Sequence, residues 1–218
     1  MKAKRKLQIT VDTLMLFILL LQMSYSIAGE LLHEILGITL FCLFALHHIL
    51  SFPYTKALLN GRHSADKILR LIVDILLTAD ILTMMLSAVI VSKHLFTFLG
   101  ISSFSDFGRT SHLLGAYWGF ALMSVHLGFH LDFMLHRIMQ NQLKKTAAYA
   151  IMFVLAAAGL VCFIHEGIYK YMLLINRFVF FDTTGGLPMF LIKYVPIMCM
   201  YAVIGYVIMS LTKSKKKG

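Results

Sequence analysis

Histidines recur at the same interval in two apolar stretches of this sequence. His33 and His47 are 14 residues apart, and so are His112 and His126. Fourteen residues make just under four turns of an α-helix, so each pair projects from nearly one face, with its members about 21 Å apart along the axis. Imidazole is a common metal ligand, and a histidine inside an apolar helix is a functional residue by default. The spacing therefore predicts two ligand positions on each of two helices.

The chain that carries these histidines is too apolar for an ordinary soluble domain of its size. It has 218 residues, of which 59% are hydrophobic and 14% charged. We expect a single all-α domain over residues 1–218, an integral membrane bundle of six transmembrane helices, with Pro53 marking the end of the second. The apolar runs long enough to cross a bilayer, at about 20 residues each, are 8–28, 31–53, 68–92, 112–135, 146–166 and 189–212.

The distribution of charge predicts the orientation of these helices. A net charge of +10 could indicate nucleic acid, but Lys and Arg concentrate at the two termini and in the short connections 54–67 and 136–145. Such connections lie on the cytoplasmic side under the positive-inside rule. We therefore expect a multi-pass membrane protein with both termini in the cytoplasm, the lipid bilayer as its surroundings and no nucleic-acid partner.

This orientation brings the four histidines to two depths. The second and fourth spans then run in the same direction, which sets His33 level with His112 (the outer pair) and His47 level with His126 (the inner pair). Haem iron takes two axial ligands on opposite faces of a flat ring, a geometry that two parallel helices can supply. We expect two non-covalent haem b groups, because the sequence has no CxxCH motif for covalent attachment. A zinc or copper site would need all its ligands within one small sphere.

Two further histidines compete for the inner position. His48 follows His47 directly, and His130 is one helical turn beyond His126. The pair His47 and His126 keeps the two helices in step, so we choose it, with His48 and His130 as alternatives.

Other residues beside the ligands are candidates for contact with a haem. Gly37 and Gly119 lie on the histidine-bearing helices, where a porphyrin needs room, although glycine also eases helix packing in membranes. Arg109, just before His112, is placed to pair with a haem propionate; ordinary exposure near the headgroups is the alternative.

The third span contains ionisable residues at unusual depth. We expect Arg70 and Asp74 to pair within the helix, as residues i and i+4. Asp80 lies deeper, where it could assist proton uptake at a quinone site or bond to a neighbouring helix.

The fourth span also resembles a known family. The segment RTSHLLGAYWGFALMSVHLGFH, together with HEILG, LHHIL and INRFVFFD in the same order, resembles the flavinylation-associated cytochromes, a bacterial family related in design to cytochrome b and ferric reductase transmembrane domains. The resemblance implies a subunit of the bacterial cytoplasmic membrane that passes electrons from a quinone or another donor on the cytoplasmic side to extracytosolic proteins carrying covalent FMN. It also implies that His33, His47, His112 and His126 are the haem ligands. The DTTGG stretch at 182–186 lacks a flavin-attachment motif, so we expect a turn there and no flavin on this chain.

Two other functions fit part of the pattern. One is a quinol-oxidising or ferric-reductase-like membrane cytochrome with its own substrate. The other, from a different class, is a non-haem transporter or assembly protein that uses its histidines for protons or metals. We expect an electron-transfer subunit of an oxidoreductase system, without catalytic side chains of its own.

Overall fold

The computed structural model describes residues 2–60, 64–101, 104–138, 141–179 and 184–214, and these residues form helices and no strand. In chain order the helices are α1 (Lys2–Met23), α2 (Tyr25–Ala28), α3 (Glu30–Leu59), α4 (Ala65–Val91), the 3-10 helix η1 (Thr97–Leu99), α5 (Ser105–Ile138), α6 (Gln142–His165), α7 (Ile168–Met172) and α8 (Gly186–Ser214).

Five of these helices are long and apolar enough to cross a membrane: α1, α3, α4, α6 and α8. Five of the six predicted ranges each fall, to within one residue, on one long helix, and the first, 8–28, covers part of α1 and all of α2. The prediction of an all-α, multi-pass membrane protein is confirmed at that level. The sixth helix, α5, is the longest, but polar side chains such as His112, His126 and Asp132 interrupt its apolar run. The sixth span therefore stays a prediction.

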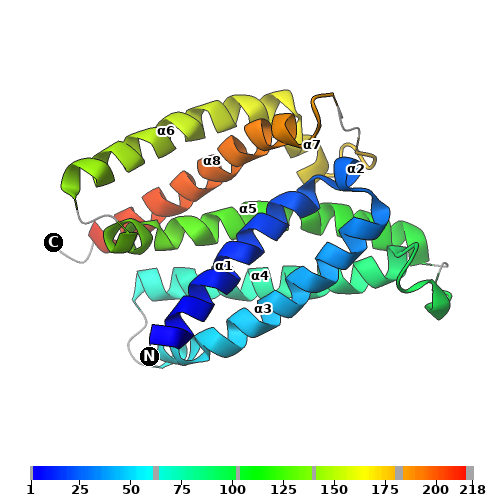
Figure 1. Cartoon of the computed structure of the whole chain (residues 1–218), viewed down its shortest axis with the longest axis horizontal. Coiled ribbons are helices and arrows are strands. Elements are labelled where there is room, and N and C mark those ends of the chain that lie inside the picture. Colours follow the sequence, from blue (N-terminus) through cyan, green and yellow to red (C-terminus); the bar gives the residue numbers. More distant parts are fainter. Residues whose placement is uncertain (1, 61–63, 102–103, 139–140, 180–183, 215–218) are drawn as a thin grey trace.

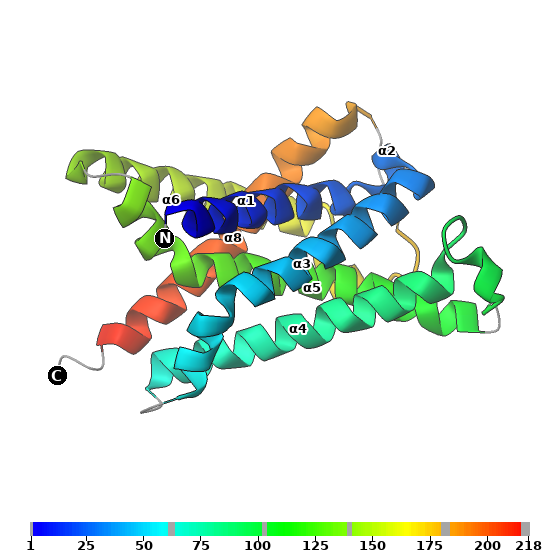
Figure 2. The same ribbon diagram turned by 60° about the horizontal axis from the view of Figure 1, so that its bottom comes forward.

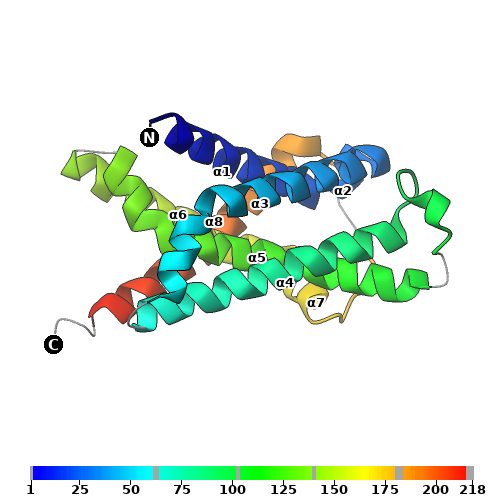
Figure 3. The same cartoon turned by 90° about the horizontal axis from the view of Figure 1, so that it is seen from below.

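Helix α5 lies at the centre of the bundle (Figure 1). It packs extensively against α4 on one side and α8 on another, and α6 covers α8 from outside. Helices α1 and α3 form a second layer, in which α3 also contacts α4 (Figure 3). The two histidine-bearing helices, α3 and α5, thus both contact α4.

Glycines set the closest helix crossings. A Cβ at Gly128 of α5 would collide with the carbonyl of Ala202, and one at Gly205 of α8 would collide with the carbonyl of Val125. Backbones that approach this closely gain van der Waals contact, which drives helix association where lipid removes the hydrophobic driving force. These crossings hold α5 and α8 in fixed register.

Two turns and one proline shape the ends of the helices. Gly29 has a φ of +83°, a conformation that residues with a side chain rarely adopt. It forms the turn that reverses the chain between α2 and α3. The Asn141 side chain accepts a hydrogen bond from the Leu143 N–H and caps α6. The expected end of the second helix at Pro53 is wrong, because α3 continues through Pro53 to Leu59. Proline removes one backbone hydrogen bond but is tolerated in membrane helices, where neighbouring groups satisfy the freed carbonyl.

Candidate functional site

Helix α4 supplies polar groups to α5 along most of its length. The two helices run antiparallel, so Ser87 meets His112, Asp80 meets Gly119 and Asp74 meets His126. At the far end, Arg70 donates a hydrogen bond of 3.1 Å to the backbone carbonyl of Phe129. Every predicted ligand of α5 therefore has a neighbour on α4 (Figure 2 shows the two helices side by side).

The structure brings the outer pair together. The ring centroids of His33 and His112 are 6.0 Å apart, and their planes are inclined by 70°. Since metal–imidazole nitrogen bonds are about 2 Å long, two imidazoles on opposite sides of one iron have ring centres roughly 6 Å apart. The two rings of the outer pair are thus separated by the distance expected for two histidines that bind one iron ion from opposite sides.

Ser87 fixes which nitrogen of His112 is free. Its hydroxyl lies 2.9 Å from the Met84 carbonyl and 3.1 Å from His112 Nδ1. When the hydroxyl donates to the carbonyl, the serine oxygen can only accept from His112, which puts the ring proton on Nδ1. The Nε2 lone pair is then available for a metal, the usual arrangement of a ligating histidine and its partner.

At the inner histidines His47 and His126, a carboxylate lies beside Nδ1, where Ser87 lies at His112. His47 Nδ1 is 2.7 Å from an oxygen of Asp12 on α1 and hydrogen-bonds to it. His126 Nδ1 is 3.0 Å from an oxygen of Asp74, which is an ion-pair distance, although the angle is outside hydrogen-bond geometry. Among the described residues this buried nitrogen has no hydrogen-bond partner. A carboxylate beside Nδ1 favours the proton there and leaves Nε2 free.

The inner pair itself is not in ring contact. Among the described residues, the ring contacts of His47, His126 and their two alternatives join His47 to His48, His48 to Phe44, His126 to His130 and His130 to Tyr54. His130 Nε2 lies 3.5 Å from Arg70 Nη1. This ring nitrogen of His130 therefore accepts a hydrogen bond from the Arg70 guanidinium. His48 Nδ1 lies 3.2 Å from the Phe44 carbonyl, which leaves its Nε2 free. This geometry disfavours His130 as a ligand and keeps His48 as an alternative to His47.

The glycines predicted to make room for a porphyrin face other side chains. A Cβ at Gly37 would lie 2.9 Å from Gln22 Nε2, and one at Gly119 would collide with the Asp80 carboxylate. Both positions therefore permit close helix packing. Arg109 is exposed in the first turns of α5, one turn before His112.

The ionisable residues of α4 reach across to α5. The intrahelical pair expected between Arg70 and Asp74 is not formed in the described structure, because Arg70 contacts Phe129 and His130 while Asp74 approaches His126. Asp80 packs against Gly119 at the middle of α5, midway in sequence between His112 and His126.

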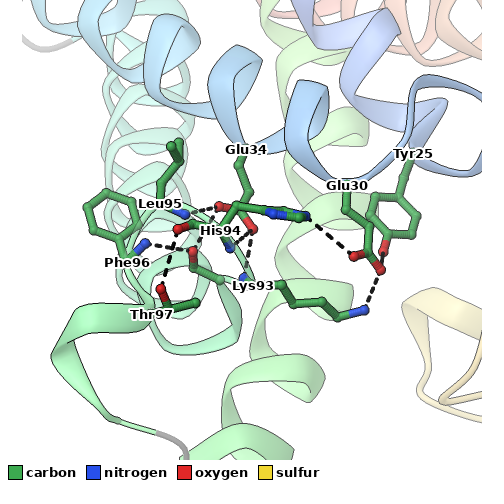
Figure 4. Close-up of polar contacts among 9 residues, drawn as sticks. Tyr25, Glu30, Glu34, Lys93, His94, Leu95, Phe96 and Thr97 are labelled. Carbon is green, nitrogen blue, oxygen red and sulfur yellow. Dashed lines mark hydrogen bonds and ion pairs between the residues drawn. The ribbon is translucent and has the colours of Figure 1, made fainter.

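Acidic side chains hold the first turns of α3 in place beside the outer pair (Figure 4). The carboxylate of Glu34, next to His33, accepts hydrogen bonds from the Ser92 hydroxyl at 2.8 Å and from the backbone N–H groups of Lys93, His94 and Leu95 at 2.7, 3.2 and 2.9 Å. These bonds tie the start of α3 to the segment that follows α4. His33 Nδ1 is buried and has no hydrogen-bond partner among the described residues, so His33, unlike His112, lacks a neighbour that would fix its tautomer.

Glu30 forms a second set of contacts one turn earlier. Its carboxylate pairs with the Lys93 amine, accepts a hydrogen bond of 3.0 Å from the Tyr25 hydroxyl and lies 3.7 Å from His94 Nε2. The hydrogen bond to Glu30 raises the pKa of the Lys93 amine, which therefore remains cationic. The ring of Tyr25 meets the His33 ring edge to face at 5.1 Å.

Sequence reasoning identified the histidines and missed most of their partners. Asp12 carried a signal, as an acid within an apolar run, and Glu34 adjoins a predicted ligand. Ser87 carried none, because serine is common in membrane helices and only the register of α4 on α5 selects it.

Neither a cluster of metal ligands nor a comparison with known proteins adds to this description of the site. In the described part of the chain, no three His, Cys, Asp or Glu side chains gather in a way that could hold a metal ion by themselves. No protein-family model matches the sequence, and no curated protein or solved structure matches it either.

Proposed function

We propose that this chain is a transmembrane dihaem b-type cytochrome that passes electrons across the bacterial cytoplasmic membrane to extracytosolic flavinylated proteins. The observation that carries the proposal is the outer pair, whose rings are 6.0 Å apart with the Nδ1 of His112 beside Ser87. Two imidazoles at that separation suit the two axial positions of one haem iron.

In this proposal, His33 and His112 would hold the outer haem, and His126 with His47 or His48 would hold the inner one. Bound haem would supply a one-electron redox couple at each site. The chain's own residues fix the rest: Ser87, Asp74 and Asp12 keep the ring protons on Nδ1, and the apolar helices exclude water from the ligands. Arg109 is our candidate for the outer propionates.

The short connections 54–67 and 136–145 leave no room for a soluble catalytic domain, so the electron donor and acceptor would be separate molecules. The resemblance of the sequence to the flavinylation-associated cytochromes implies a quinone or another carrier on the cytoplasmic side as the donor and a separate FMN-bearing protein outside as the acceptor. The sidedness rests on the distribution of Lys and Arg.

Single histidine substitutions test the assignment. His112→Ala should remove one haem and keep the other, and His126→Ala should do the converse, because the two sites share no ligand. His136→Ala is a matched control, since this exposed histidine lies on the same helix and only bonds to the Asp132 carbonyl. Optical redox titration of each variant would count the remaining components. If both variants kept the full haem content of the native protein, the assignment would be wrong.

A second candidate is a proton or metal transporter without haem. The observation in its favour is that carboxylates inside predicted spans approach histidines at two places, Asp12 at His47 and Asp74 at His126. Such pairs also serve proton relays. This candidate predicts a colourless purified protein and loss of substrate uptake in Asp74→Asn.

A further inference from the structure

An exposed tyrosine contacts one member of the outer pair. Tyr25 contacts the His33 ring at 5.1 Å and is itself 38% exposed. His112, the other member of the pair, has the buried Ser87 against its Nδ1. His33 is therefore the member of the pair that adjoins the exposed Tyr25.

The surface around Tyr25 is polar and ordered. Three of its neighbours are well exposed: Lys93 (61%), His94 (43%) and Glu30 (40%). Glu30 contacts Tyr25, Lys93 and His94, and Glu34 fixes the backbone that carries Lys93 and His94 (Figure 4). We call Tyr25, Glu30, Lys93 and His94 the Tyr25 patch. Charged groups held in fixed positions at the end of an apolar bundle can steer a water-borne partner without first having to be ordered.

We infer that the Tyr25 patch is the docking surface at which a one-electron carrier outside the membrane exchanges electrons with the outer site. The inference rests on the proposed function, because without haem there is no electron to exchange. In each event one electron leaves the outer site and reduces the carrier by one electron. No covalent bond forms or breaks, and no proton has to move.

Small charged oxidants test this surface directly. The purified protein in detergent is reduced, mixed rapidly with ferricyanide, an anion, or with hexaammineruthenium(III), a cation, and its reoxidation is followed optically. Lys93→Gln removes a positive charge and should slow the anionic oxidant and speed the cationic one, by about twofold or more at low ionic strength. Glu30→Gln should do the reverse with both oxidants.

Comparing Lys93→Gln with Glu30→Gln distinguishes an effect on docking from structural damage. Both substitutions break the same Glu30–Lys93 ion pair, so structural damage would move the rates in the same direction in both. Lys170→Gln is the matched control, because Lys170 is an exposed lysine on α7, which Figure 3 places apart from α2. Its rates should equal those of the native protein, and the differences at the patch should vanish near 1 M salt, where the screening length is about 3 Å.

Readouts other than rate keep the outcomes distinct. Haem content and the optical spectrum of Lys93→Gln and Glu30→Gln should equal those of the native protein. Equal rates in all variants, or changes of one sign in both patch variants, would each overturn the docking surface and leave the haem assignment standing. A purified protein without haem would overturn the proposed function, and the docking surface with it.

Discussion

Three histidines of the candidate site, His47, His112 and His126, each have Nδ1 beside an oxygen of another helix. The partners are Asp12, Ser87 and Asp74. A partner at Nδ1 fixes the tautomer and the orientation of the ring, and a carboxylate also makes the opposite nitrogen a stronger ligand. At this scale the sequence predicts ligand types well, because histidine is rare in apolar helices. It does not predict the partners, which depend on the rotation of α1 and α4 about their axes.

Asp74→Asn tests the role of the carboxylate at His126. Loss of the negative charge should lower the affinity for the inner haem by about 10- to 100-fold, and raise the midpoint potential of that component, because a less basic ligand stabilises the oxidised iron less. Haem titration of the apoprotein and optical potentiometry would measure both effects. Asp106→Asn, which removes an exposed acid at the start of α5, should change neither; equal effects of the two substitutions would contradict the role of Asp74.

At the scale of elements, α5 is held by close contacts with α4 and α8. The glycines at these contacts differ in what they face: Gly119 faces the Asp80 side chain, and Gly128 faces the Ala202 backbone. Gly37, where α3 meets α1, faces the flexible end of Gln22. The apolar runs predicted the long helices, but these helices begin or end several residues outside the predicted ranges, and the first range continues past the end of α1 through α2. The end at Pro53 was mispredicted because a rule for soluble helices does not hold where neighbouring groups satisfy the backbone.

Gly128→Ala should destabilise the protein more than Gly37→Ala. The added methyl group at Gly128 meets a backbone carbonyl that cannot move without shifting α8, whereas Gln22 can adopt another rotamer. We expect a loss of about 1–3 kcal/mol for the first and a smaller loss for the second, measured by thermal unfolding in detergent. The opposite ranking would contradict the described crossing of α5 and α8.

Gly119→Ala tests the contact between α4 and α5 through a double-mutant cycle. In the native background the methyl group collides with the Asp80 carboxylate and should lower stability, whereas in Asp80→Ala the space is free and the same change should cost little. Thermal unfolding of the four proteins gives the coupling. Additive effects would show that Asp80 does not fill the space beside Gly119.

At the scale of the whole molecule, the candidate site spans the bundle. The outer pair lies where α3 and α5 begin, and the inner histidines lie nearer the ends of the same helices, so electrons could cross most of a bilayer within one chain. The pattern of helices and charges predicts this arrangement, because both follow from composition. Whether the inner rings face one iron depends on side-chain rotation, which periodicity leaves open between His47 and His48.

Cysteine labelling tests the orientation. In a background without Cys42, Cys162 and Cys199, a cysteine replacing Lys93 should react with a membrane-impermeant maleimide added to intact cells. A cysteine replacing Lys56, at the opposite end of α3 from Glu30, should react only after the membrane is opened. The reverse pattern would place the outer pair on the cytoplasmic side.

The most direct test of the central claim is the haem content of the purified protein, measured by its visible spectrum and by the pyridine haemochrome assay. The proposed function predicts a Soret band, b-type α-bands on reduction and two haems per chain. A protein that folds, purifies from membranes and shows no Soret band after expression with sufficient haem would contradict it.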